Sequence, residues 1–410
     1  MSGSRMMFIA CLAILLLMGT DGSAADRSLR GYVQEMPLLW ESSPLLGIGQ
    51  EWRFDSQTLA RQNFRCYPHP RITIAAECDQ RLLIGESARL IRQASDAYRF
   101  DEPYFGWRRS LLDEEDAILE ARIDRLWITG YHGDLEVTLG RQRIAWGTAL
   151  VWNPIDLFNP ASPLDFANIE KPGADGLRAQ YYLGAASRIE IAGALRRPEE
   201  HSIAAAQLVL NRWEYDWHFL GGRQAKEWVA GSAWAGNIHG GGFRGELLGR
   251  FPAEETAKQA GAGKQDGPPA FGVSGEGSDQ EDAALIAVLS GDYTFRSSLY
   301  LHSEVLFDSR GTTGDAGGFR LLEALQEGRL TPARWSVFAE MARQLHPLVY
   351  AGLSGILNPS DGSWYAGPTV TWNALTNLDV TLTGQLFGGD SGTEFGDNGT
   401  ILLAQGKWSW

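Results

Sequence analysis

Apolar and polar side chains alternate through most of this chain, and this alternation limits what it can fold into. Between Asn377 and Phe387 one face carries Leu378, Val380, Leu382, Gly384 and Leu386, and the other carries Asp379, Thr381, Thr383 and Gln385. The same two-residue period recurs at 135–139, 188–196 and 243–251. A period of two places successive side chains on opposite faces of an extended strand. The sequence therefore predicts an all-β protein.

The length of these runs separates a membrane barrel from a soluble sandwich. Many runs extend over about 9 to 12 residues, which suits a tilted span of a bilayer, whereas strands of soluble domains are typically about 5 or 6 residues long. Aromatic residues gather near the ends of the apolar faces, as they do at the two interfaces of a membrane. They are Trp127, Tyr293, Phe295, Trp335, Trp372, Trp408 and Trp410. We therefore expect a transmembrane β-barrel.

The connections between strands alternate between tight and long. Arg296–Ser297, His346–Pro347 and Leu375–Thr376 look like tight turns, whereas 308–334 and 388–398 are long and polar. Barrels of the outer membrane have this asymmetry. We expect about sixteen to eighteen antiparallel strands over residues 26–410, with short periplasmic turns and longer extracellular loops. Residues 252–282, rich in Gly, Ala and acidic side chains, are predicted to be a mobile acidic extracellular loop.

The N-terminus indicates export. The apolar run Met6–Met18 follows Arg5 and precedes small residues up to Ala25. It is shorter than the ~20 residues of a membrane-spanning helix but suits the apolar region of a secretory signal. We predict a signal peptide over residues 1–25. The exported chain then keeps Cys66 and Cys78, which can pair in an oxidising compartment as a disulfide that closes a loop.

The C-terminus carries an aromatic strand. In residues 399–410, Thr400, Leu402, Ala404, Gly406, Trp408 and Trp410 share one face, and Trp410 is the last residue. This arrangement resembles the C-terminal assembly signal of bacterial outer-membrane barrels. It implies that Trp408 and Trp410 are read by the barrel-assembly machinery, and that the chain resides in outer-membrane lipid. A net charge of -14 argues against binding to nucleic acid.

The densest motif is GRQRIAWGTALVWNPIDLFNP at Gly140–Pro160, within a long connection at 140–176. Its Asn-Pro steps disfavour helix and favour a fixed irregular loop. Such a loop can fold inward as a constriction, with Arg141, Arg143 and Asp156 setting its field. It can equally be a brace packed on the barrel rim.

This motif resembles the hallmark of a poorly characterised family of Gram-negative outer-membrane β-barrel porins. The matching residues are Arg141-Gln142, Trp146-Gly147, Asn153-Pro154, Asp156 and Asn159-Pro160. The resemblance implies a barrel and a pore and names no solute. We count Asn153 and Asn159 of the same loop among the candidate constriction residues.

Charged residues elsewhere fit a polar barrel interior. Glu120, Arg122 and Asp124 share one face of the predicted strand 117–128 and would tune ion preference there. Glu214, Asp216 and His218 are also in phase, and an acid–histidine pair can activate a serine. Polar interior positions explain this second set without chemistry, so we expect no enzyme. The sequence holds no HExxH, CxxC or phosphate-binding motif, and we expect no metal or cofactor.

Together these features predict an outer-membrane porin, a passive diffusion channel for small hydrophilic solutes or ions. The alternative is a structural sheath or assembly partner whose barrel encloses another protein, such as an electron-transfer conduit or an export complex. Homo-oligomers are compatible with either interpretation. Short helices at 86–97 and 319–328 are expected to cap the barrel mouth.

Overall fold

The computed structural model describes residues 26–41, 51–93, 102–159, 173–253, 283–318, 320, 323–324 and 328–410. Almost all of its regular structure is β. The strands are β1 (Asp26–Glu41), β2 (Trp52–His69), β3 (Ile72–Gly85), β4 (Glu102–Pro103), β5 (Arg108–Asp113), β6 (Ala117–His132), β7 (Leu135–Gln142), β8 (Ala174–Tyr182), β9 (Arg188–Arg197), β10 (Ile203–Arg212), β11 (Tyr215–Gln224), β12 (Glu227–Ile238), β13 (Gly241–Pro252), β14 (Ala284–Thr294), β15 (Leu299–Asp308), β16 (Trp335–His346), β17 (Val349–Leu357), β18 (Trp364–Leu375), β19 (Leu378–Gly388) and β20 (Ile401–Ser409).

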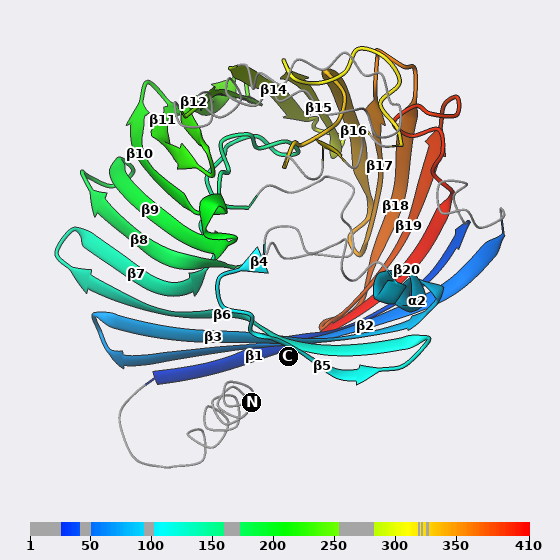
Figure 1. Cartoon of the computed structure of the whole chain (residues 1–410), viewed down its shortest axis with the longest axis horizontal. Coiled ribbons are helices and arrows are strands. Elements are labelled where there is room, and N and C mark those ends of the chain that lie inside the picture. Colours follow the sequence, from blue (N-terminus) through cyan, green and yellow to red (C-terminus); the bar gives the residue numbers. More distant parts are fainter. Residues whose placement is uncertain are drawn as a thin grey trace, which may run out of the picture.

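The strands close into an antiparallel ring (Figure 1). Each long strand pairs with its sequence neighbour, β3 pairs directly with β6, and β20 returns to pair with β1. The short strands β4 and β5 stand outside this order, because β4 pairs only with β9 and β5 only with β6. Eighteen strands therefore form the barrel, which confirms the predicted fold class.

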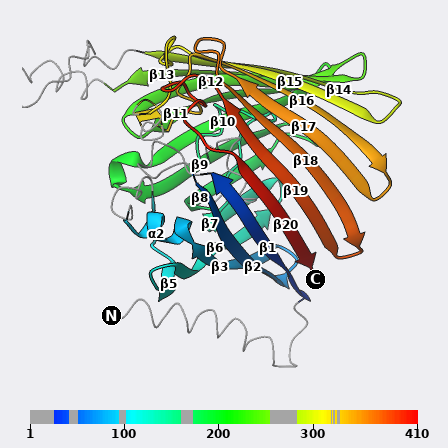
Figure 2. The same cartoon turned by 90° about the vertical axis from the view of Figure 1, so that its right-hand side faces the viewer.

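The two ends of the barrel differ. Trp213–Glu214, His239–Gly240 and Thr376–Asn377 are two-residue turns at the end where the C-terminus also lies (Figure 2), called the turn end below. The opposite end, called the loop end, carries the connections 309–334 and 389–400. Two connections at the loop end are shorter than expected. β9 and β10 are joined by residues 198–202, and β11 and β12 by Ala225–Lys226.

The alternation seen in the sequence becomes an apolar outside and a polar or densely packed inside. Outward leucines and isoleucines such as Leu139, Ile191 and Leu382 are more than half exposed, whereas the inward side chains of Glu190 and Gln207 are buried. Exposed aromatic rings lie near the strand ends, among them Trp228, Trp335, Trp364, Trp372 and Trp408. This is the surface pattern of barrels that face lipid.

The last residue completes the ring. The backbone N–H and carbonyl of Trp410 pair with the carbonyl and N–H of Gly31, at 3.0 and 3.2 Å. A Cβ at Gly31 would lie 2.5 Å from the indole of Trp410, so only glycine leaves room for the ring. The assembly role of Trp408 and Trp410 remains a prediction.

Helical structure is minor. α2 (Glu86–Gln93) begins where the first short helix was expected, and residues 94–97 lie outside the described part. The second expected helix, like the predicted signal peptide and most of the 252–282 loop, falls largely or wholly outside it. Within the described ranges, no helix has both the length and the apolar character needed to cross a membrane.

Candidate functional site: a loop folded into the barrel

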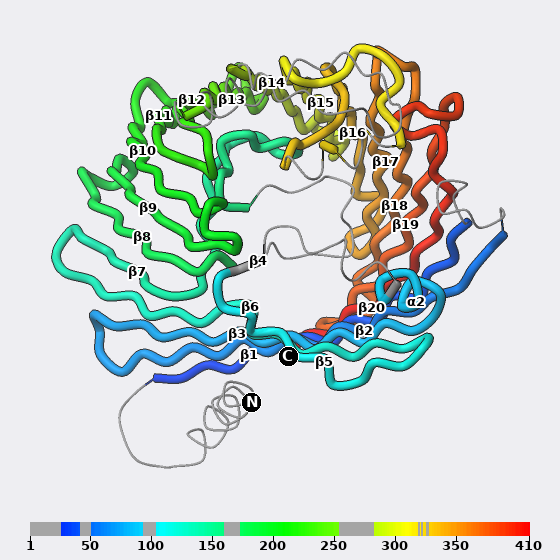
Figure 3. Tube along the Cα trace, in the orientation of Figure 1, coloured from blue at the N-terminus to red at the C-terminus, as the bar shows by residue number. Residues whose placement is uncertain are grey.

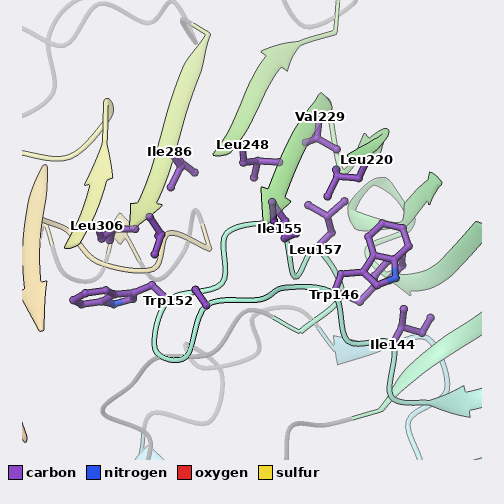
Figure 4. Packing of buried hydrophobic residues seen from close by; sticks show 14 of the residues in the cluster. Ile144, Trp146, Trp152, Ile155, Leu157, Leu220, Val229, Leu248, Ile286 and Leu306 are labelled. Carbon is purple, nitrogen blue, oxygen red and sulfur yellow. The ribbon is translucent and has the colours of Figure 1, made fainter. Parts of the chain in front are cut away.

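The chain leaves β7 at Gln142 and runs inside the barrel as a loop without regular structure (Figures 1 and 3). We call residues 143–159 the inner loop. Its apolar side chains pack against inward side chains of β11 to β15, as Figure 4 shows. The packed residues are Ile144, Trp146, Trp152, Ile155, Leu157 and Phe158 from the loop, with Leu220, Val229, Leu248, Ile286 and Leu306 from the wall. Burying each large side chain contributes roughly 1.5–3 kcal/mol, so the loop is part of the core.

Glu246 on β13 holds the inner loop on both sides of its tip. Its carboxylate, which is fully buried, accepts backbone N–H bonds from Thr148, Ala149 at 2.9 Å and Ile155 at 3.2 Å. No cation is among the partners of this carboxylate in the described residues. Converging N–H groups can stabilise an anion in this way, and bonds to a charged acceptor are about twice as strong as neutral ones.

Glu304 on β15 holds the far tip of the loop in the same manner. Three consecutive N–H groups, of Leu150, Val151 and Trp152, donate to its carboxylate at 3.2, 3.3 and 2.6 Å. The ring of Trp152 also meets Phe338 of β16 edge-on, with centroids 6.4 Å apart. The loop therefore reaches from β7 to β16 across the inner wall.

The two ends of the inner loop are fixed by further bonds. Near its start, the indole N–H of Trp146 donates to Glu190 on β9 at 2.7 Å. Near its end, Arg196 and Gln224 donate to the carbonyls of Phe158 and Leu157 at 2.6 and 3.0 Å. The loop thus has one defined path along the wall.

The Asn-Pro motif stabilises this path from within. The carbonyl of Asn153 accepts from the N–H of Asp156 at 3.0 Å, and Asn159 Nδ2 donates to the carbonyl of Ile144 at 2.5 Å. The carboxylate of Asp156 accepts the N–H of Trp146 at 3.4 Å. Asp156 and Asn159 are buried, so these residues shape the loop rather than present charge to passing solutes.

Arg141 was expected in the constriction, and this expectation is wrong. It forms a buried two-bond ion pair with Asp175 of β8, at 2.7 and 2.8 Å, and lies 4.6 Å from the ring centre of Trp107. Arg141 and Asp175 line a groove with Leu139, Leu177 and Leu195, whose side chains face outward. Arg141 also donates to the carbonyls of Ile123 and Phe105, beyond the point where the β6–β7 pairing ends. Arg141 therefore connects neighbouring segments of the barrel wall and does not project into the interior.

Arg143, by contrast, is exposed, and no ion pair among the described residues involves it. Two further arginines on the inner wall contact Glu190, the partner of Trp146. Arg178 bonds Glu190 at 2.6 and 3.0 Å, and Arg188 lies 3.4 Å from the same carboxylate. Both remain about a quarter exposed, so two cations and one anion give this side of the interior a net positive charge.

The predicted charge ladder on β6 belongs to a balanced cluster. Arg122 bonds Asp79 at 2.6 and 3.1 Å, and Asp124 bonds Arg61 at 2.8 Å. Glu77 and Arg125 complete three cations and three anions, which we call the ion-pair cluster. Glu120 stands apart, 3.9 Å from the partly exposed Arg108.

Another buried carboxyl, that of Glu394, joins three connections at the loop end. Glu394 accepts from Asn358 at 3.1 Å and from Thr331 at 3.4 Å, and its own N–H donates to Asp361 at 2.9 Å. Burial, reinforced by the neighbouring charge of Asp361, raises the pKa of Glu394 to about 7. We call these four residues the mouth cluster.

Two other expectations are not met. Cys66 stands opposite Ile74, and Cys78 stands opposite Gln62, four positions before Cys66 on β2, so the two cysteines do not form a disulfide. Glu214 lies in the turn between β10 and β11, where it has positive φ, and so does not share the face of Asp216 and His218. His218 bonds Gln207 at 3.4 Å, and among the described residues it has no hydrogen bond to a serine.

The residues that hold the inner loop were not singled out by their sequence pattern. Glu190 and Glu246 lie on polar strand faces, as their alternation indicates, but so do many interior residues. Nothing local distinguishes an interior carboxylate that meets water from one that receives a loop about a hundred residues away. Within the described residues, no group of His, Cys, Asp or Glu is arranged to hold a metal ion.

Among known proteins, only solved structures match this chain, and they identify its fold. No protein-family profile and no curated protein matches the chain. Solved structures do: OprD of Pseudomonas aeruginosa, an outer membrane protein, superposes with a TM-score of 0.55 at 8% identity, covering 96% of this chain and 95% of that one. OccAB2 of Acinetobacter baumannii gives 0.54 at 8%, covering 94% and 98%. The P. aeruginosa outer membrane protein OpdK gives 0.52 at 8%, covering 93% and 99%. The chain therefore has the barrel fold of these proteins over nearly its whole length.

Proposed function

We propose that this protein is a porin of the bacterial outer membrane, a passive diffusion channel for small hydrophilic solutes or ions. The observation that carries the proposal is the inner loop, which narrows the barrel from within and is held there by Glu246 and Glu304. An eighteen-stranded barrel is too wide for wall side chains to fill. A fixed loop reduces that width.

The outer surface supports the location. Backbone polar groups at hydrocarbon depth must be paired, and a closed barrel pairs all of them. The described outer wall is largely apolar and has aromatic rings near its ends, as such a location requires. The structures with this fold include outer membrane proteins.

The interior supports a preference for anions beside the inner loop. Arg143 begins the loop, and Arg178 and Arg188 contact Glu190, the partner of Trp146, whereas the ion-pair cluster on β2, β3 and β6 is neutral overall. Charges on low-dielectric walls of a narrow passage act strongly on passing ions.

The inner loop also weighs against a sheath around another protein. A lumen-occupying partner would need the volume that the loop and its packed aromatic side chains hold. The loop is part of the core, with Trp152 and Ile155 almost completely buried, so displacing it would expose large apolar side chains.

The test is conductance of the purified full-length protein in a planar bilayer. A porin gives discrete steps that grow with salt concentration. A protein that is folded, as shown by heat-modifiable migration, but gives no steps would contradict the proposal. Tags inserted in the 252–282 loop and in the Thr376–Asn377 turn test the orientation, because only the first should label on intact cells.

A further inference from the structure

On β1, β2 and β3 some outward side chains are polar, unlike most of those on the rest of the described outer wall. On β19 the outward side chains are Leu378, Val380, Leu382 and Leu386, with Gly384 between them. On β2 the outward positions between Phe54 and Phe64 are instead Ser56, Thr58, Ala60 and Gln62. Glu35 on β1 and Gln80 on β3 lie beside them on the same face. We call Glu35, Ser56, Thr58, Gln62 and Gln80 the polar patch.

The polar patch lies at hydrocarbon depth. Phe54 and Phe64 are ten positions apart on β2. At about 3.4 Å per residue and a strand tilt of 35–45°, that segment rises roughly 25 Å, which is the height of the apolar band of a membrane barrel. The two phenylalanines therefore mark the edges of the band, and the polar side chains lie within it.

The side chains of the polar patch have donors and acceptors beyond those used in their bonds to each other. The carboxylate of Glu35 accepts from the hydroxyls of Ser56 and Thr58, one on each oxygen. The amides of Gln62 and Gln80 bond each other in both directions, at 3.0 and 3.1 Å. An amide has two donor hydrogens and two acceptor lone pairs, so each glutamine retains capacity for an external partner. Lipid tails offer none.

The side chains around the two glutamines are small. Ala60 and Ala121 stand directly opposite Gln80 on either side, and Cys78 stands opposite Gln62. Small residues let two transmembrane surfaces approach closely enough for polar side chains to bond across them.

An exposed cation flanks the patch on its far side. Arg109 of β5 is opposite Ala121 and so shares the outward face. It is exposed and, in the described residues, has no ion pair. Across the sheet the order is β1, β2, β3, β6, β5, so Glu35 and Arg109 lie on the two outer strands and Gln80 on the central one.

We propose that a second copy of this chain packs against the polar patch, related by a two-fold axis along the membrane normal near Gln80. Such an axis brings β1 of one copy opposite β5 of the other, so Glu35 faces the partner's cationic strand. The two copies of Glu35 stay four strand spacings apart, roughly 19 Å, and do not repel closely. The side-chain amides of Gln62 and Gln80 near the axis can donate to and accept from the same amides of the second copy.

Lipid is a poorer occupant. Headgroups of the outer leaflet lie above the hydrocarbon band, and their phosphates would be repelled by Glu35. A two-fold partner at this site must be membrane-embedded and must offer both donors and a cation at the matching positions. The same face of this chain meets all three conditions.

Cross-linking in native outer membranes tests the proposal. In a chain with Cys66→Ala and Cys78→Ala, Ala60→Cys lies one strand from the axis, so its two copies stand roughly 10 Å apart. A short bis-maleimide cross-linker should give covalent dimers at this position. Leu382→Cys on β19 is the matched control and should give none. Absence of dimers from position 60, equal yields from both positions, or a cross-link to a different protein would overturn the proposal.

A charge exchange tests the pairing itself. Arg109→Glu, at an exposed position, should lower the dimer fraction of the purified protein in mild detergent about tenfold, measured by light scattering. Adding Glu35→Lys should restore it. Heat-modifiable migration verifies that each variant is folded. A monomeric unmodified protein, or a double variant that is folded but no more dimeric than Arg109→Glu alone, would show that the polar patch does not bind a second copy.

Discussion

Buried charged side chains have different kinds of partner on the two sides of the barrel interior. In the ion-pair cluster, Arg61, Glu77 and Asp124 are partners on neighbouring strands. On the facing wall, Glu246 and Glu304 meet backbone N–H groups of the inner loop, and Glu304 lies 152 residues from Trp152. The first arrangement fastens strands to each other. The second fastens a loop to the wall, so the same residue types give strength in one place and pore shape in the other.

This difference predicts which changes affect conductance. The largest effect is expected for Glu246→Ala with Glu304→Ala, which removes the acceptor of six N–H bonds. Each bond to a charged group contributes roughly 1.5–3 kcal/mol, so the loop should leave the wall. Single-channel conductance should rise about twofold or more, as the barrel interior widens. A folded variant with unchanged conductance would mean that apolar packing alone holds the loop.

The matching change in the ion-pair cluster is Arg61→Met. It leaves Glu77 and Asp124 buried without their central cation, which should lower the free energy of unfolding by about 3–5 kcal/mol. Conductance should stay within experimental error, since the loop is untouched. Arg89→Met, which removes a half-exposed pair with Glu86, is the control and should cost less than about 1 kcal/mol in denaturant unfolding.

The same difference explains which features of the structure could be predicted from the sequence. Alternation is a local property, so it located β19, the parity of Arg122 with Asp124, and the closed barrel. It could not place Arg141, because strand parity alone does not say that Phe105 and Trp107 fold over that position. Nor could it find Glu304 as a loop ligand, since its partners lie in a segment without period. The Asn-Pro motif predicted a fixed loop, and only the packing of Trp152 fixed where it lies.

A smaller effect is expected on ion preference. Arg143→Gln with Arg188→Gln removes the exposed cation of Arg143 and the quarter-exposed cation of Arg188 but keeps Arg178 paired with Glu190. The reversal potential in a salt gradient should shift toward cations, and the shift should shrink at high salt as screening shortens the reach of the charges. Arg212→Gln with Arg296→Gln, two exposed arginines at the turn end, is the control of equal charge. Equal shifts in both variants would indicate that only overall charge matters.

The smallest effect concerns the mouth cluster, where a titratable carboxyl replaces the permanent charges of the two interior walls. Glu394 has a pKa of about 7 when folded and 4.5 ordinarily, so its protonated form is the one that the folded loops favour. The stabilisation is complete below about pH 4.5 and is lost as pH rises through 7, because the ionised carboxyl is buried near Asp361. Hydrogen exchange at the N–H of Phe395, which donates to Ser363 at 3.3 Å, should therefore be faster at pH 8 than at pH 6 beyond the intrinsic base-catalysed increase. Glu394→Gln keeps the hydrogen bonds with Asn358 and Thr331 possible without a charge, so it should abolish this excess and protect the N–H at both pH values. An excess that persists in Glu394→Gln would assign the pH dependence to another group.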